Sequence, residues 1–180
     1  YNHAAFEERL GLLLAERSGR ARRPAREDGG LLSDGVVLFI DLDHFTVIND
    51  IAGHDAGDDV LRHVARLLES QVRQIGWAAR LGGDEFAVVL PGCTLARGEA
   101  VAEQLRASVQ ASEPSYQGRS FMLGVSIGLV VLDATLHDVA SVLYAADMAC
   151  YDAKRAGRNR VETRPAGHAS ISGRMALGPV

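Results

Sequence analysis

The sequence predicts an α+β domain in which a central, mostly antiparallel sheet is flanked by helices. Short apolar runs of strand length alternate along the 180 residues with longer stretches of helical periodicity. Two of the strand-like runs, 77–81 and 85–90, are separated by only a short turn, which predicts an antiparallel hairpin. The order strand, helix, hairpin, helix, strands and helix is typical of an α+β sandwich.

The N-terminal part predicts one amphipathic helix and the first core strand. Apolar residues recur at helical spacing, with charged residues between them, until Ser18 and Gly19. These apolar residues are Phe6, Leu10, Leu13 and Leu14. The charged segment 20–30 contains proline and glycine, so it predicts a solvated loop. Residues 36–40 form a continuous apolar run that predicts a central strand.

The rest of the chain completes the pattern. An apolar face predicts a helix over 58–74 with Asp58 and Asp59 in its first turn. Gly82 and Gly83 readily supply the positive φ that a tight hairpin turn needs. The further predictions are a helix over 95–109, a strand or strand pair over 121–132, a helix over 138–156, a strand over 160–163 and a linker over 165–180.

The composition is that of one soluble globular domain with a hydrophobic core. The chain is 47% hydrophobic and 23% charged, and its mean hydropathy is +0.02. A net charge of −4 and a pI of about 5.9 provide no overall basic field. We therefore expect no nucleic acid polymer as a partner.

Two cysteines and the apolar runs bear on the cellular location. Cys93 and Cys150 lack the spacing of a metal or redox motif, which favours a reducing compartment. The longest apolar run, 121–132, is too short to cross a bilayer as a helix. We expect a cytoplasmic domain without direct membrane contact, although the full-length protein could be anchored through segments outside this sequence.

Acidic residues follow two strands that could be neighbours. Asp41 and Asp43 end the strand 36–40, and Asp84 and Glu85 follow the hairpin glycines. If the strands pair, these carboxylates meet at one sheet edge, where a cation must offset their repulsion. Hard oxygen ligands suit Mg²⁺ or Mn²⁺, which in proteins are commonly shared with a phosphate. The hairpin glycines would let a phosphate or ribose approach the backbone closely.

The sequence GGDEF at 82–86, together with DxDxFxxxNDxxGHxxGD at 41–58, resembles the GGDEF family of diguanylate cyclases. The similarity extends from Asn2 through ADMACYDAKRAGRNRV, which ends at Val161. The detailed residue pattern further resembles domains that precede an EAL phosphodiesterase domain in composite proteins. It implies a GGDEF domain over 1–164 whose N-terminal segment is truncated. The implied fold is nucleotidyl-cyclase or palm-like, with a ferredoxin-like core.

The implied reaction condenses two GTP molecules into cyclic di-GMP and two pyrophosphates with Mg²⁺ or Mn²⁺. The resemblance implies that Asp84 and Glu85 are catalytic, with Asp84 as the candidate base for the ribose 3′-hydroxyl. The implied metal ligands are Asp41, the backbone carbonyl of Leu42, Asp84 and Glu85. Because each GTP attacks the α-phosphate of the other, two domains must face each other as a homodimer.

The resemblance also implies a GTP-binding site at further matching positions. Asn49 and Asp58 would read the guanine edge, and His54 would line the same pocket. Lys154 and Arg158, one helical turn apart, would neutralise the terminal phosphates. The implied substrate-binding residues are Asn49, His54, Asp58, Gly82, Gly83, Lys154 and Arg158. The resemblance also implies neighbouring sensory and EAL domains in the full-length chain.

Two departures from the family pattern bear on activity and regulation. Many members have lysine where this chain has Thr46, which favours weaker triphosphate binding. The inhibitory product site of the family reads RxxD, and here the matching stretch begins with Arg73 and ends with Gly76. The carboxylate of that site is therefore missing.

Other interpretations stay open at this point. Asp41–Asp43 could be a turn or a helix cap, His54 a packed or surface residue, and Lys154 with Arg158 a solvated helix end. The alternative function is a catalytically weak or inactive GTP-binding module that regulates an adjacent EAL domain. A palm-like polymerase would share the metal chemistry, but the acidic balance of the chain argues against a template track.

Overall fold

The computed structural model describes residues 2–20, 35–133 and 135–164. The predicted loop over 20–30, apart from its first residue, and the predicted linker over 165–180 lie outside these residues. In the described part of the chain, no helix combines the length and the apolar character needed to cross a membrane.

A five-stranded sheet forms the centre of the domain. Its strands are β1 (Gly35–Leu42), β2 (Trp77–Gly82), β3 (Glu85–Pro91), β6 (Val125–Val131) and β7 (Arg160–Arg164). Their spatial order is β2-β3-β1-β6-β7, and every pair is antiparallel except β6 with β7. The prediction of a mostly antiparallel sheet is confirmed, and the predicted hairpin is β2 with β3.

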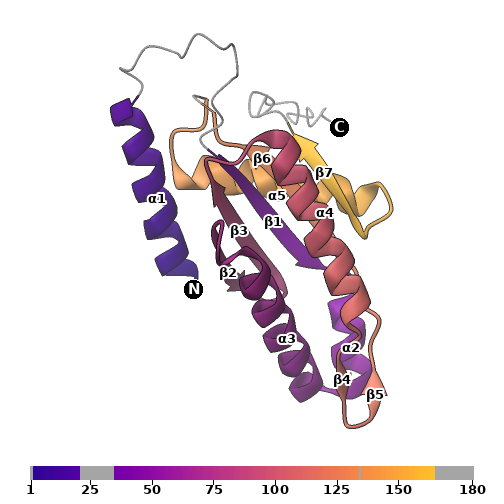
Figure 1. Ribbon diagram of the computed structural model, residues 1–180. Coiled ribbons are helices and arrows are strands. Elements are labelled where there is room, and N and C mark those ends of the chain that lie inside the picture. Colours follow the sequence, from indigo (N-terminus) through magenta and orange to yellow (C-terminus); the bar gives the residue numbers. More distant parts are fainter. Residues whose placement is uncertain (1, 21–34, 134, 165–180) are drawn as a thin grey trace, which may run out of the picture.

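Helices cover both faces of this sheet (Figure 1). They are α1 (His3–Arg20), α2 (Phe45–Ala52), α3 (His54–Val72), α4 (Leu95–Ser112) and α5 (Val139–Arg155). Alternate residues of β1 point to opposite faces. Leu38 and Ile40 pack in one core cluster with α2, α3 and α4, whereas Val37 and Phe39 pack in another with α1 and α5. The α+β fold follows from these two apolar layers.

Two segments differ from the sequence-based predictions. The helix predicted over 58–74 begins at His54, so Asp55, and not Asp58 or Asp59, is the acidic residue of its first turn. A separate helix, α2, precedes it, because Gly53 with φ of 86° breaks the helical path between the two.

The second difference concerns the strand pair predicted over 121–132. Only β6, which begins at Val125, joins the main sheet. A small separate hairpin, formed by β4 (Ser115–Tyr116) and β5 (Arg119–Ser120), precedes it. Positive φ values at Gln117 and Gly118 reverse the chain there. A turn this short leaves little periodic pattern in the sequence.

Close packing at Gly128 fixes the position of α5 over the sheet. A Cβ atom at this residue of β6 would lie 2.1 Å from the Ala146 carbonyl oxygen and 2.2 Å from the Cys150 nitrogen. The strand and the helix backbone therefore meet without a side chain between them. This approach brings the C-terminal turn of α5, with Lys154, to the end of β1.

Candidate active site

The site lies where β1 ends beside the tip of the β2–β3 hairpin. Asp41 belongs to the β1 face that α5 covers, and its side chain is only 10% exposed. Leu42 points the opposite way into the core under α2 and α3. Only the backbone of Leu42 can therefore serve a ligand, as the predicted carbonyl role requires.

The hairpin tip is tied directly to the end of β1. Glu85 is the antiparallel register partner of Asp41, and the Leu42 N–H donates to the Asp84 carbonyl oxygen at 3.2 Å. Directly opposed residues of an antiparallel pair lie on the same face of the sheet. Asp41 on β1, Glu85 on β3 and Asp84 in the hairpin turn thus lie at one edge of the sheet, as the sequence predicted for paired strands.

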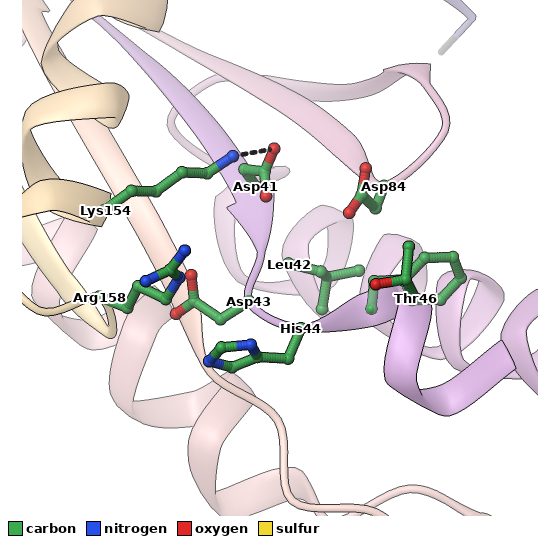
Figure 2. Close-up of a pocket in the computed structure, with 9 residues that line it drawn as sticks. Asp41, Leu42, Asp43, His44, Thr46, Asp84, Lys154 and Arg158 are labelled. Atoms are coloured by element: carbon green, nitrogen blue, oxygen red, sulfur yellow. Dashed lines mark ion pairs between the residues drawn. The ribbon is translucent and has the colours of Figure 1, made fainter. Parts of the chain in front are cut away.

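Lys154 partly offsets this concentration of negative charge. Its Nζ lies 2.8 Å from Asp41 Oδ2, an ion pair that Figure 2 shows between α5 and β1. Burial lowers the pKa of Lys154, but the hydrogen bond and charge of Asp41 outweigh this effect and raise it above its usual value. The ammonium group therefore stays charged.

Both opposed carboxyl groups have raised pKa values. For Asp41 the main cause is burial, which the Lys154 hydrogen bond counteracts and the charge of Asp84 reinforces. For Glu85 the main cause is again burial, and the charge of Asp41 adds to it. The surroundings of both carboxyl groups therefore disfavour the ionised forms even with Lys154 in place. A further cation would stabilise those ionised forms.

Asp43 has a different role from Asp41. One of its carboxylate oxygens accepts from Ser126 Oγ at 2.7 Å and the other from the Asn159 backbone N–H at 2.9 Å. Both oxygens are therefore engaged by protein groups. Of the two aspartates in the DLD sequence, Asp41 is the one with the freer ligand atoms.

A cleft of about 230 Å³ opens over these groups. Lys154 and Arg158 lie on one side of it and Asp84 on the other, as Figure 2 shows. The cleft is lined by Asp41, Leu42, Asp43, His44, Phe45, Thr46, Asp84, Lys154 and Arg158. It thus unites Asp41, Leu42 and Asp84 with both predicted phosphate-binding cations. Lys154 lies on α5, but Arg158 lies in the turn after the helix, so the prediction that the two are one helical turn apart is wrong. Glu85 does not line it but stands beside Asp41 on the neighbouring strand.

Sequence reasoning did not single out His44 or Phe45 as site residues. His44 has φ of 58° and turns the chain out of β1 into α2, which places it at the cleft. The available signal was their position directly after the DLD carboxylates. A left-handed backbone at a histidine cannot be foreseen from spacing alone.

The predicted guanine-reading residues lie outside this cleft, on α2 and α3. Asn49 is half-buried, and its Oδ1 has no hydrogen-bond partner among the described residues. A Cβ atom at Gly57 would lie 1.9 Å from that oxygen, so Asn49 packs against the residue that precedes Asp58. His54 and Asp58 are exposed and four residues apart on α3, so they share one helix face.

The hairpin glycines are open, as predicted. Gly82 and Gly83 are exposed, and no described atom lies within 4 Å of a Cβ built on either of them. Gly83 has φ of 50°, which explains why a glycine is suited to this place in the turn. The prediction of a positive φ at Gly82 is wrong, because Gly82 is still the last residue of β2. The backbone at the hairpin tip is therefore accessible to a ligand group.

The donor set has the chemistry of a hard-cation site. Among residues 2–20, 35–133 and 135–164, no three acidic, histidine or cysteine side chains already stand in a metal-binding arrangement. Mg²⁺ commonly takes only one or two protein carboxylates and completes its shell with phosphate oxygens and water. Asp41 and Asp84, facing one cleft with two cationic side chains for phosphate, fit that description.

Comparison with known proteins agrees with this geometry. The family described as diguanylate cyclase, GGDEF domain, matches residues 1–160. Probable diguanylate cyclase DgcE of Escherichia coli (strain K12) is 38% identical over 160 residues, which cover 89% of this chain and 14% of that protein. The chain spans between 14% and 35% of the length of six curated relatives that it matches, DgcE among them.

Solved structures show the same fold. The GGDEF domain of PA1120 (YfiN or TpbB) from Pseudomonas aeruginosa aligns with a TM-score of 0.78 at 36% identity, over 91% of this chain and 95% of that chain. The coiled coil and GGDEF domain of DgcB from Caulobacter crescentus, in complex with c-di-GMP, aligns with a TM-score of 0.79 at 28% identity, over 91% and 81%. With Asp41 and Asp84 from the two motifs at one cleft, and the family match covering residues 1–160, this chain belongs to the GGDEF family of diguanylate cyclase domains.

Proposed function

We propose that this domain is a diguanylate cyclase that condenses two GTP molecules into cyclic di-GMP and two pyrophosphates. The observation that carries the proposal is that Asp41, on β1, and Asp84, in the turn between β2 and β3, line one cleft together with Lys154 and Arg158. A carboxylate pair next to two cations is suited to a metal-bound triphosphate. The relatives named as diguanylate cyclases and the c-di-GMP complex of DgcB support the same reaction.

Lys154 and Arg158 neutralise the phosphates in this proposal. Arg158 can bind two phosphate oxygens at once, whereas Lys154 acts as a compact charge. A phosphate in the cleft competes with Asp41 for Lys154, which frees a carboxylate oxygen for Mg²⁺ or Mn²⁺. The metal ligands would be Asp41, the Leu42 carbonyl, Asp84 and Glu85. When bound, the ion would stabilise negative charge on the attacking and leaving oxygens.

Asp84 is the proposed base for the ribose 3′-hydroxyl, and Glu85 supports it from the next position of the hairpin. Gly82 and Gly83 let the ribose or phosphates lie against the turn. The cleft of one domain holds one GTP in this proposal, while each GTP attacks the α-phosphate of the other. The reaction therefore requires two domains related by a two-fold axis.

Asn49, Asp58 and His54 form the proposed base-binding part of the site. Asn49 offers an amide and Asp58 a carboxylate, which complement the donors and acceptors of the guanine edge and so favour GTP over ATP. Packing of Asn49 against Gly57 supports this grouping, because Gly57 is the residue that precedes Asp58 on α3. His54 shares the exposed helix face of Asp58.

Substituting Gly57 with alanine is expected to weaken GTP binding by about tenfold, without abolishing folding. The new methyl group would overlap Asn49 Oδ1 and press on Phe45, so the amide must leave its position. Loss of one or two hydrogen bonds to the base accounts for a change of this size. Titration calorimetry with GTP measures it, and ATP serves as the comparison ligand. Unchanged GTP affinity would contradict the assignment of Asn49.

A second candidate function is a weakly active or inactive GTP-binding module that controls an adjacent EAL phosphodiesterase domain. The observation in its favour is that Thr46 lines the cleft where many family members have lysine, so one phosphate-binding cation is missing. The neighbouring EAL and sensory domains, and the cytoplasmic location, remain predictions from the sequence.

One assay separates the two functions. Purified protein is incubated with GTP and Mg²⁺, and the products are resolved by chromatography. Cyclic di-GMP and pyrophosphate in a ratio of one to two support the cyclase. GTP binding without turnover, at concentrations where a dimer is present, selects the regulatory module. Absence of both binding and product would refute the two together.

Product feedback through the family's RxxD site is not expected in this domain. Arg73 is present, but the acidic position is Gly76, where a Cβ atom would lie 1.9 Å from the Val89 carbonyl oxygen. We therefore expect Gly76→Asp to lower the free energy of unfolding by about 1–3 kcal/mol instead of restoring inhibition. Urea unfolding measures the first effect, and initial rates with added cyclic di-GMP measure the second.

A further inference from the structure

The turn that carries Arg158 into the cleft has an unfavourable backbone. Arg158 and Asn159 have φ values of 64° and 44°, so two consecutive residues other than glycine are left-handed. Such conformations each cost on the order of 1 kcal/mol or more, and they persist only where the surrounding structure enforces them. Something must therefore hold this turn between α5 and β7.

One support comes from the end of β1. The Asn159 N–H donates to Asp43 Oδ2 at 2.9 Å, while Ser126 Oγ donates to the other oxygen of the same carboxylate at 2.7 Å. Gly124 leaves the room for this contact, since a Cβ atom there would lie 3.1 Å from Asp43 Oδ2. The carboxylate thus anchors the backbone of the turn to the central sheet.

A second support comes from α4, on the other side of the turn. Arg106 Nη1 donates to Asn159 Oδ1 at 3.1 Å. The guanidinium is itself held by Glu103, which accepts from Nε at 2.9 Å and from Nη2 at 2.6 Å, and by Gln110 Oε1 at 2.8 Å. The Arg106 side chain is only 16% exposed. It is therefore a fixed group, although it does not line the cleft.

We propose that Arg106 is a positioning residue for nucleotide binding, which acts through Asn159 to hold Arg158 at the triphosphate. The inference rests on the proposed function, because it takes the phosphates of GTP as the ligand of Arg158. The chain of contacts runs from Arg106 to the Asn159 side chain and, through the Asn159 backbone, to Asp43. Arg158 is the adjoining residue of the same turn.

The first test needs no nucleotide. In Arg106→Ala, amide hydrogen exchange of residues 157–160 is expected to rise while exchange in β1 and β3 stays unchanged. Asn159→Gly tolerates the left-handed backbone and keeps the N–H for Asp43, but removes the acceptor of Arg106. It should therefore give the same change. Arg97→Ala is the matched control, because Arg97 is an exposed arginine about 13 Å away along the same helix.

The second test measures binding of guanosine 5′-(α,β-methylene)triphosphate with Mg²⁺, since the reaction would break the α–β bond of GTP. Arg106→Ala is expected to lower its affinity three- to tenfold, a loss of the size that one typical hydrogen bond contributes. In an Arg158→Ala background the same substitution should have almost no effect, because the two act in series. Arg97→Ala should bind like the parent domain.

The outcomes separate the two proposals. Unchanged exchange at 157–160 in Arg106→Ala, or an equal loss of affinity with and without Arg158, would overturn the positioning role. If the unsubstituted domain binds no nucleotide, the proposed function fails. Faster exchange at 157–160 in Arg106→Ala would then still show that Arg106 holds the turn. The claim that this turn positions Arg158 for the phosphates of GTP would be refuted.

Discussion

Replacing Asp84 with alanine is expected to reduce the rate of cyclic di-GMP formation by about 10²–10⁴-fold, which in practice abolishes product formation. Asp84 faces the cleft from the hairpin tip, opposite Lys154 and Arg158, and the proposed reaction uses it both as the base for the 3′-hydroxyl and as a metal ligand. No other carboxylate of the hairpin lines the cleft in the described part of the chain, because Glu85 stands beside Asp41 in the sheet.

The measurement is the initial rate of cyclic di-GMP formation from GTP and Mg²⁺, followed by chromatography. Glu69→Ala is a suitable control, because Glu69 is an exposed carboxylate in the last part of α3. Thermal unfolding of both variants shows whether the fold is intact. Chelation of the divalent ion should stop product formation by the unsubstituted domain. If Asp84→Ala keeps a tenth or more of the rate, Asp84 is neither the base for the 3′-hydroxyl nor an essential metal ligand.

The largest expected effect on stability comes from a single methyl group at Gly128. A Cβ atom there would overlap three backbone atoms of α5, and backbone cannot yield as a flexible side chain does. We expect Gly128→Ala to lower the free energy of unfolding by about 3 kcal/mol, the upper part of the range for overpacked cores. Because α5 must move, product formation should fall as well, through displacement of Lys154 from Asp41.

Gly11→Ala provides the matched control for this prediction. Gly11 lies in α1, where a Cβ atom would make only an ordinary contact, 3.7 Å from Val139 Cγ2. Alanine is favoured over glycine within a helix by about 1 kcal/mol, so this variant should be as stable as the parent domain or more stable. Urea unfolding of the two variants measures the difference. Equal stability would mean that α5 does not depend on Gly128 for its position.

Much of the fold was predictable because its signals are local. The hairpin over 77–90 follows from two apolar runs around a glycine pair, and α4 and α5 follow from their apolar spacing. The helix α2 was missed, because it spans only eight residues. Its boundary with α3 depends on the conformation of Gly53, which the residue type permits but does not dictate.

The sequence by itself determined the family, the strand–turn–strand motif of GGDEF and the identity of the carboxylates at the end of β1, since each depends on residues close together in the chain. Tertiary structure alone decided that Lys154 pairs with Asp41, that Asp43 anchors the turn after α5, and that Arg106 reaches Asn159. These partners are up to 116 residues apart. They meet because β1 lies between β3 and β6 while α5 and β7 pack beside β6, an arrangement set by burial of two apolar layers and not by any local pattern.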